Sequence, residues 1–159
     1  MKPSKVCFEL ISNDNIEGFS APPYPDEGGV ATIGYGTTIY PNGTRVTLKD
    51  KPITKEQAMA YLEYHCTQDA KLIEPLIKVP LNQNQIDATL CFVYNFGVPK
   101  FKSSTLLKVI NQNPNDFDKI EAQWRRWIYE LNIKTGEKEI KKGLVKRRVA
   151  EFLLYKRPV

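Results

Sequence analysis

The first half of the chain changes its hydrophobic period twice. Over residues 4–16, apolar side chains recur on one stripe of a helix. A glycine and the proline cluster at 22–25 end that pattern, because proline lacks an amide N–H and restricts the residue before it. Over residues 28–48, β-branched and aromatic residues alternate with glycines around a Pro-Asn-Gly turn, which predicts short antiparallel hairpins.

Helical spacing returns at Thr54 and dominates the rest of the chain. The run Thr54-Lys55-Glu56-Gln57 has the form of a capping box, and the pattern that follows predicts one long helix ending at Pro75. Further helices are predicted over 82–97, from 103 onward, over 115–127 and over 144–154.

This order of elements predicts an α+β fold in one domain, residues 1–159, built as two lobes. A small β-hairpin lobe, with its mixed region at about 12–60, is joined by the long helix to an all-helical lobe at about 61–159. The first helix is expected to pack on the helical lobe.

The composition is that of a folded chain, with 42% hydrophobic and 26% charged residues. Nowhere does an apolar run approach the roughly 20 residues of a membrane span, so no membrane insertion is expected. The first residues lack the apolar stretch of a secretory signal, which favours a cytoplasmic location. Three widely spaced cysteines and a single histidine, His65, predict neither a disulfide framework nor a metal site. His65 is expected to be a passenger on the long helix.

Charge is distributed unevenly along the chain. Residues 1–80 hold 8 basic and 10 acidic side chains, a net −2, whereas residues 81–159 hold 15 and 8, a net +7. A basic half attracts polyanions, which leaves nucleic acid and an anionic cell wall open as partners, beside the simpler interpretation of a solvated helix face. Arg147 and Arg148 of this half are interpreted as surface residues, with an approach to Glu17 or to the anionic groups of the wall as the alternative.

Three residues between the first predicted helix and the predicted hairpins are candidate catalytic residues. Glu17 closes the first helix among apolar neighbours, Asp26 lies on a loop rich in proline and glycine, and Thr32 begins a strand. Such different settings can separate the proton affinities of two carboxyl groups, and the expectation is that a desolvated Glu17 holds a proton while Asp26 stays ionised. Glycosidic hydrolysis needs this pair, and a threonine hydroxyl can orient a water molecule. The spacing alone is equally compatible with a helix-end Glu and a turn Asp.

The sequence around these residues resembles that of the phage-type lysozymes of glycoside hydrolase family 24. The family's motif is Glu, eight residues, Asp or Cys, five residues and Thr, and the intervals from Glu17 to Asp26 and from Asp26 to Thr32 both match it. The three residues lie within the sequences Glu-Gly-Phe, Tyr-Pro-Asp and Thr-Ile-Gly-Tyr-Gly. Later segments also follow the family in order, among them Leu81–Ala88, Phe92–Gly97, Phe101–Leu107 and Gly143–Glu151.

The resemblance implies a lysozyme-like fold with a cleft between the lobes and cleavage of the β-1,4 bond between N-acetylmuramic acid and N-acetylglucosamine. Glu17 is then the general acid, and Asp26 with Thr32 supports the transition state and the incoming water. The family's best-studied members invert the anomeric centre, which predicts carboxyl groups roughly 6.5–9.5 Å apart. Thr37 departs from the family, which often has histidine after Gly36; this puts a packing interaction in doubt.

The same resemblance nominates four substrate-binding residues. Tyr35, Tyr94, Asn95 and Ser104 match positions expected to contact sugar, with core packing and helix capping as the alternative for each. Trp124 and Trp127 are expected in the core rather than stacked on sugar.

Two further hypotheses compete with a muramidase that needs no cofactor. One is a non-catalytic peptidoglycan-binding module of the same fold, and the other is a basic nucleic-acid-binding protein, although no recognition motif supports it. Within the enzymes, a transglycosylase differs from a hydrolase in its products. An endolysin of this kind is expected to act as a monomer on peptidoglycan, to accumulate in the host cytoplasm and to depend on a holin for its release.

Overall fold

The computed structural model describes all residues, 1–159, and has seven α-helices and two small antiparallel sheets. The α-helices are α1 (Lys5–Ser12), α2 (Lys55–Ile73), α3 (Gln83–Phe96), α4 (Val98–Lys102), α5 (Thr105–Gln112), α6 (Phe117–Trp124) and α7 (Lys142–Tyr155). The strands are β1 (Ser20–Pro25), β2 (Ala31–Gly34), β3 (Tyr129–Leu131) and β4 (Lys138–Ile140). The α+β class predicted from the sequence is confirmed.

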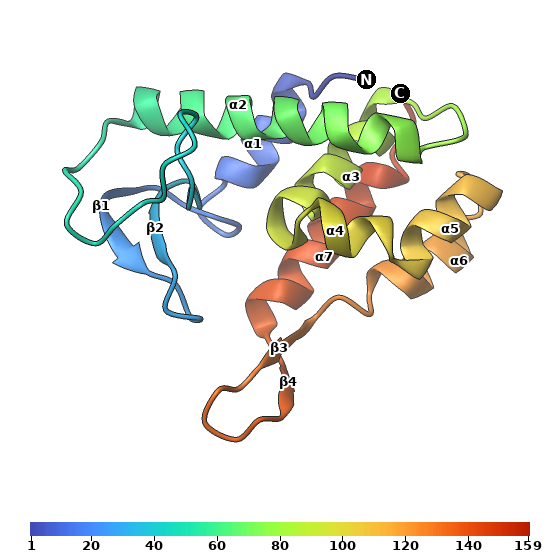
Figure 1. Ribbon diagram of the computed structural model, residues 1–159. Helices are drawn as coiled ribbons and strands as arrows, with labels where there is room; N and C mark the ends of the chain where they lie inside the picture. The colour runs from blue at the N-terminus through green and yellow to red at the C-terminus, as the bar shows by residue number, and fades with distance from the viewer.

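The N-terminal sheet pairs β1 with β2 and lies on one side of the molecule (Figure 1). Only part of it was expected, because β1 contains the prolines at 22, 23 and 25 that the sequence pattern marked as a break. A two-stranded sheet tolerates proline, since each strand is an edge and needs only some of its N–H groups. Between β2 and α2 the chain adds only isolated bridges, Ile33 with Thr37 and Ile39 with Arg45.

Helix α2 crosses from the sheet to the helical part of the molecule (Figure 1). It begins with the predicted capping box: the Thr54 side chain accepts from the Gln57 amide, and the Gln57 side chain accepts from Thr54 N. His65 on this helix is not a passenger, because its Nε2 lies 2.5 Å from the carbonyl oxygen of Ile39. The helix is therefore tied to the β-rich segment through this side chain as well as through its N-terminus.

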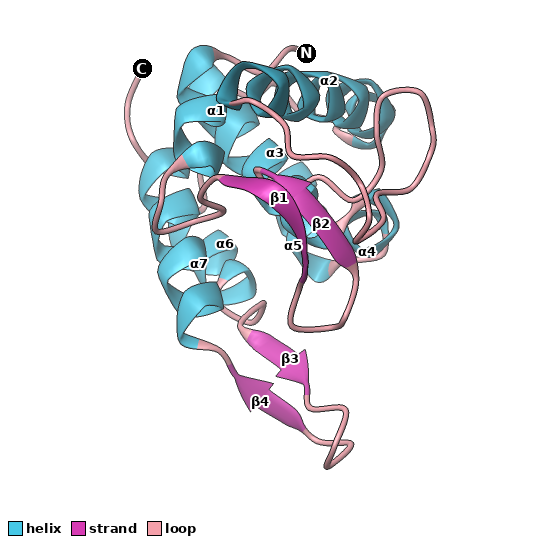
Figure 2. Ribbon diagram, turned by 90° about the vertical axis from the view of Figure 1, so that its left-hand side faces the viewer, coloured by secondary structure: helices cyan, strands magenta, loops and turns pink.

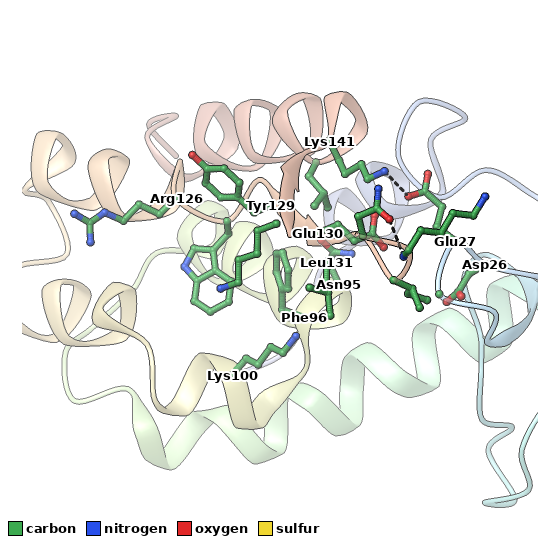
Figure 3. Close-up of a pocket in the computed structure, with 17 residues that line it drawn as sticks. Asp26, Glu27, Asn95, Phe96, Lys100, Arg126, Tyr129, Glu130, Leu131 and Lys141 are labelled. Atoms are coloured by element: carbon green, nitrogen blue, oxygen red, sulfur yellow. Dashed lines mark hydrogen bonds and ion pairs between the residues drawn. The ribbon is translucent and has the colours of Figure 1, made fainter. Parts of the chain in front are cut away.

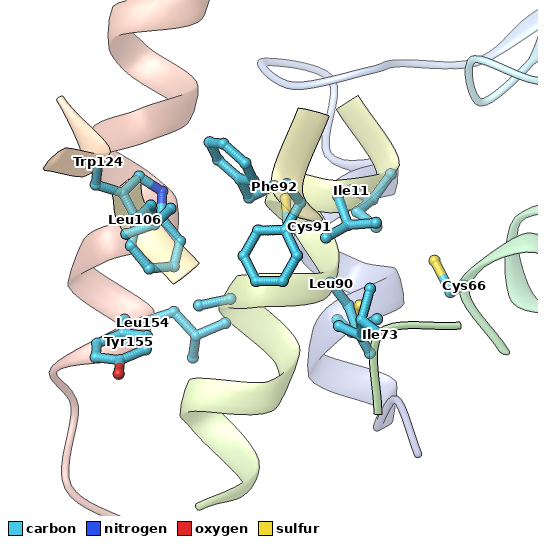
Figure 4. Close-up of a cluster of buried hydrophobic side chains, with 14 of the residues drawn as sticks. Ile11, Cys66, Ile73, Leu90, Cys91, Phe92, Leu106, Trp124, Leu154 and Tyr155 are labelled. Atoms are coloured by element: carbon cyan, nitrogen blue, oxygen red, sulfur yellow. The ribbon is translucent and has the colours of Figure 1, made fainter. Parts of the chain in front are cut away.

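The hydrophobic core surrounds α3, which packs against α1, α2, α4 and α7. Figure 4 shows Leu90, Cys91 and Phe92 of α3 between side chains of these neighbouring helices. Trp124 is fully buried in the same core and Trp127 packs against it, as predicted. Because α3 touches so many elements, it fixes the helices that carry the residues of the cleft.

The helix boundaries differ from the sequence pattern mainly where a turn follows. Helix α1 ends at Ser12 rather than residue 16, and residues 13–18 turn instead, with Gly18 at φ +64°. None of the helices combines the length and hydropathy that a membrane span requires.

A hairpin interrupts the part of the chain expected to be wholly helical. Strands β3 and β4 pair with Tyr129 opposite Ile140 and Glu130 opposite Glu139, and the hairpin projects below α7 (Figure 2). Each strand has only three residues, which is too short for a recognisable alternation in the sequence. The hairpin faces the loop between β1 and β2 (Figure 2).

Candidate active site

A cavity of about 780 Å³ opens between the N-terminal sheet and the helical part of the molecule. Glu17, Asp26 and Thr32 all line it, so the structure brings the three predicted residues to one place. Its other walls come from the end of α3 and the start of α7. Residues far apart in the sequence therefore form one concave site.

Glu17 lies in the turn after α1 rather than at the end of that helix. Its amide donates to the carbonyl of Ile11 at 3.2 Å, which folds the turn back onto the helix. The side chain points into the cavity and keeps 20% of its surface exposed. The carboxyl group is thus held on a short, anchored segment while staying accessible.

Arg147 contacts this carboxyl group directly. Its Nη1 lies 2.5 Å from Glu17 Oε1, and its Nη2 donates to the carbonyl of Cys91 at 3.0 Å. The interpretation of Arg147 as a surface residue was wrong, because its side chain is only 5% exposed, and the alternative of an approach to Glu17 is the one that the structure shows. The contact occupies Oε1, whereas Oε2 of Glu17 has no hydrogen-bond partner in the protein and stays available to a ligand.

Behind Glu17 lies a buried charge network centred on Glu151. This fully buried carboxylate accepts from Arg147, from Arg148 at 2.6 Å and from the indole of Trp124 at 2.8 Å. Arg148, also predicted at the surface, is buried and donates to Asn95 Oδ1 at 2.9 Å. The buried carboxylate of Glu151 thus offsets positive charge of the two buried guanidinium groups, because buried ions need a partner of opposite charge.

Asp26 and Thr32 are linked through the backbone of Val30. Asp26 Oδ1 accepts from the Val30 amide at 2.8 Å, and the Asp26 amide donates to the Val30 carbonyl at 2.9 Å. The Thr32 hydroxyl donates to that same carbonyl at 2.9 Å. Each side chain thus uses one contact to fix its position. Asp26 Oδ2 and the lone pairs of the Thr32 hydroxyl remain free.

Gly36 brings the backbone against the carboxyl group of Glu17. A Cβ atom built at this position would lie 2.6 Å from Glu17 Oε2, and the backbone φ is +82°. Both the close approach and the left-handed conformation require glycine. The Gly-Tyr-Gly sequence therefore shapes the wall that faces the candidate acid.

Burial and the nearby carboxyl groups raise the pKa of two tyrosines that line the cavity. Burial, followed by the negative charge of Glu17, raises the pKa of the Tyr94 hydroxyl, which donates to the Tyr35 carbonyl at 2.7 Å. Burial, then the charges of Glu17 and Asp26, raises the pKa of Tyr24. Sequence reasoning missed Tyr24, which lies on β1 two residues before Asp26 and lines the same cavity.

The other nominated residues divide between cavity and core. Tyr94 and Asn95 line the cavity, whereas Tyr35 is buried against Phe19. The Ser104 hydroxyl donates to the Phe101 carbonyl and caps the N-terminus of α5. For Tyr35 and Ser104 the structure therefore favours the packing and capping alternatives.

A second cavity, of about 970 Å³, continues the first toward the β3–β4 hairpin (Figure 3). Both cavities share six residues: Asp26, Glu27, Asn95, Glu130, Lys141 and Leu144. The additional walls include Phe96, Trp127 and several lysines. Together the two cavities form a groove long enough to hold more than the reacting bond, with aromatic and polar surfaces suited to sugars. No cluster of three or more His, Cys, Asp or Glu side chains is placed to hold a metal ion.

Comparison with known proteins assigns the chain to a family. The phage lysozyme family matches residues 14–151. The chain is 38% identical over 147 residues to an endolysin of Acyrthosiphon pisum secondary endosymbiont phage 1, covering 92% of this chain and 93% of that protein. It is 37% identical to the SAR-endolysin of bacteriophage PS119, covering 87% of this chain and 75% of that protein.

Solved structures agree with this placement. An endolysin from Escherichia coli O157:H7 phage FAHEc1 superimposes with a TM-score of 0.86 at 30% identity, covering 98% of this chain and 93% of that one. The muramidase domain of SpmX from Asticaccaulis excentricus gives 0.80 at 28% identity, covering 99% of each chain.

The fold and the groove therefore define a lysozyme-like glycosidase. The chain belongs to the phage lysozyme family, and it is a lysozyme that hydrolyses peptidoglycan. Neither the nucleic-acid-binding alternative nor the non-catalytic wall-binding alternative receives support from these relatives.

Proposed function

We propose that Glu17, Asp26 and Thr32 form the catalytic centre of an inverting muramidase. The observation that carries this proposal is their convergence on one cavity: Glu17 and Asp26 each have one carboxyl oxygen tied to the protein and the other without a partner, and the Thr32 hydroxyl keeps its lone pairs. The substrate would be the β-1,4 bond between N-acetylmuramic acid and N-acetylglucosamine, as in the muramidase domain to which the fold is similar.

In this mechanism Glu17 gives a proton through Oε2 to the departing glycosidic oxygen. Arg147 holds the other oxygen and so fixes the orientation of the group. Asp26 Oδ2 faces the charge that develops on the sugar ring and, with the Thr32 hydroxyl, activates the attacking water. Tyr94 and Asn95 line the same wall and would contact the sugars.

The surrounding biology follows from the endolysins among the relatives. The protein would act as a monomer in host lysis, reaching the wall from the cytoplasm with the help of a holin. The chain would form a single catalytic domain of two lobes, at about residues 12–60 and 61–159, with the groove between them.

Glu17→Gln and Asp26→Asn test the catalytic assignment. Each keeps the size and shape of the side chain, and each should lower the hydrolysis of purified peptidoglycan by about 10²-fold or more while binding persists. A matched control is Glu9→Gln, because Glu9 lies on α1, just before the turn that carries Glu17, and outside the cavity. Full lysis by Glu17→Gln would overturn the assignment.

The product chemistry tests the inverting hydrolysis separately. Mass spectrometry of the released fragments distinguishes a reducing end from the anhydro-muramic end of a transglycosylase. Proton NMR recorded in the first minutes identifies the anomer that forms. An initial product with the configuration of the substrate would contradict inversion.

A further inference from the structure

Three charged side chains connect the loop between β1 and β2 with the β3–β4 hairpin. Lys141 Nζ lies 3.7 Å from Glu27 Oε2 and 3.9 Å from Glu139 Oε2. Glu130, on β3 of the hairpin, lines the same two cavities as Glu27 and Lys141. Glu27, Glu130 and Lys141 are named the cleft bridge here, and Figure 3 shows Lys141 reaching across to Glu27.

The cleft bridge lies where the two cavities of the groove meet. All three of its residues line both the cavity of about 780 Å³ at Glu17 and the cavity of about 970 Å³ at the hairpin. A polymer occupying both cavities must pass this point. The bridge therefore meets the substrate without belonging to the set of reacting groups.

The loop on one side of the bridge carries Asp26. Glu27 follows Asp26 directly, and the Asp26 carboxylate is bound to the backbone of its own loop through Val30. Any displacement of the loop therefore moves Asp26 with it, relative to Glu17 on the anchored turn. The bridge is the point at which the opposite side of the groove holds this loop.

The contact is exposed and therefore reversible. The Glu27 side chain is 71% exposed and that of Lys141 is 36% exposed, in contrast to the buried pair of Arg147 with Glu151. Exposed ion pairs contribute little to stability and break easily. Such a contact can open to admit a glycan strand and close again, which a buried network cannot do.

We propose that the cleft bridge positions Asp26, by drawing its loop against the hairpin when the groove is occupied. The proposal rests on the catalytic role of Asp26 proposed above. Glu27, Glu130 and Lys141 are positioning residues, because they act through the loop and not on the reacting bond.

The bridge also has a built-in dependence on pH. The hydrogen bond to Glu27, partial burial and the charge of Glu27 raise the pKa of Glu130, and Lys141 opposes this shift. The charged groups around Glu130 are Asp26 and Glu27 on the loop, Glu139 and Lys141 on the hairpin side, and Lys142 at the start of α7. While Glu130 is protonated, its hydroxyl can donate a hydrogen bond to Glu27. Once Glu130 ionises, the two carboxylates repel each other and Lys141 alone holds the loop.

Charge reversal and its rescue form the first test. Lys141→Glu places a further negative charge against Glu27 and Glu130, and should lower kcat on soluble glycan fragments roughly 5–10-fold with KM within about twofold. Adding Glu27→Lys to this variant restores opposite charges and should recover at least about half of kcat. Lys146→Glu, an exposed reversal on α7 outside the groove, is the matched control.

Glu130→Gln supplies the second test, with a readout that simple loss of structure does not move. Its amide donates to Glu27 at every pH, so the ratio of its kcat to that of the unmodified enzyme should rise roughly 2–3-fold between about pH 5 and pH 7.5. Identical pH profiles, or failure of the double reversal to restore kcat, would overturn the proposal. Loss of the catalytic assignment itself would show instead as full activity in Asp26→Asn, so the two failures are distinguishable.

Discussion

Folding raises the pKa of the carboxyl group of Asp69. It lies half-buried on α2 beside the buried Cys66 and Ala70, and it makes no hydrogen bond or ion pair. Burial raises the pKa of Asp69 from 3.8 to about 6. The folded state therefore holds its proton more strongly than the unfolded chain does. This favourable contribution is present at low pH and is lost as pH rises through the folded pKa, so ionised Asp69 destabilises the protein at neutral pH.

The size of the effect follows from the shift. At about 1.36 kcal/mol per pKa unit, a shift of about 2 units corresponds to a ceiling of about 3 kcal/mol at neutral pH. Because the group is only half-buried and water screens it, about 1–2 kcal/mol is expected. Asp69→Asn removes the titration and should stabilise the protein by this amount at about pH 7.5, with a gain about 1 kcal/mol smaller near pH 4.5.

Urea unfolding at the two pH values measures this difference. Asp14→Asn is the control, because Asp14 is exposed and makes no hydrogen bond with its side chain. A stability gain for Asp69→Asn that is the same at both pH values would refute the reasoning, since only titration of the buried carboxyl group makes the gain depend on pH.

Three further predictions address the buried network, the wall beside Glu17 and the thiols. Glu151→Gln leaves buried guanidinium charge uncompensated and should lower the free energy of unfolding by about 3–5 kcal/mol, measured by urea titration. Gly36→Ala should lower activity at least about 10-fold, whereas Gly43→Ala, with a similar positive φ but open space, should alter stability alone; equal activities would refute this. A hydrogen bond with Cys66 and burial raise the pKa of the Cys7 thiol, so a thiol reagent should react with the cysteines only after unfolding.

The elements that could be predicted are those whose signals are local. The capping boxes at Thr54 and Asn82 use neighbouring residues, and both helices begin where the sequence places them. Strand β1 and the β3–β4 hairpin were missed for a different reason. A proline-rich strand of a two-stranded sheet and a hairpin of three-residue strands depend on their partners more than on their own propensity.

The candidate site divides in the same way. The spacing of Glu17, Asp26 and Thr32 can be read in one short stretch, and the resemblance supplied their proposed roles. Arg147 could not be assigned from sequence, because 130 positions separate it from Glu17 and a helix pattern of lysines and arginines looks the same whether solvated or buried. Only tertiary packing shows that this arginine is part of the groove.

That long-range contact has a consequence for the order in which the protein becomes active. The chain is synthesised from its N-terminus, so Glu17 leaves the ribosome long before the helix that carries Arg147. Until α7 has folded onto α3, the carboxyl group lacks the cation that orients it and the groove lacks one wall. Under the proposed mechanism a nascent or truncated chain is inactive, and wall-degrading activity arises only with a finished polypeptide.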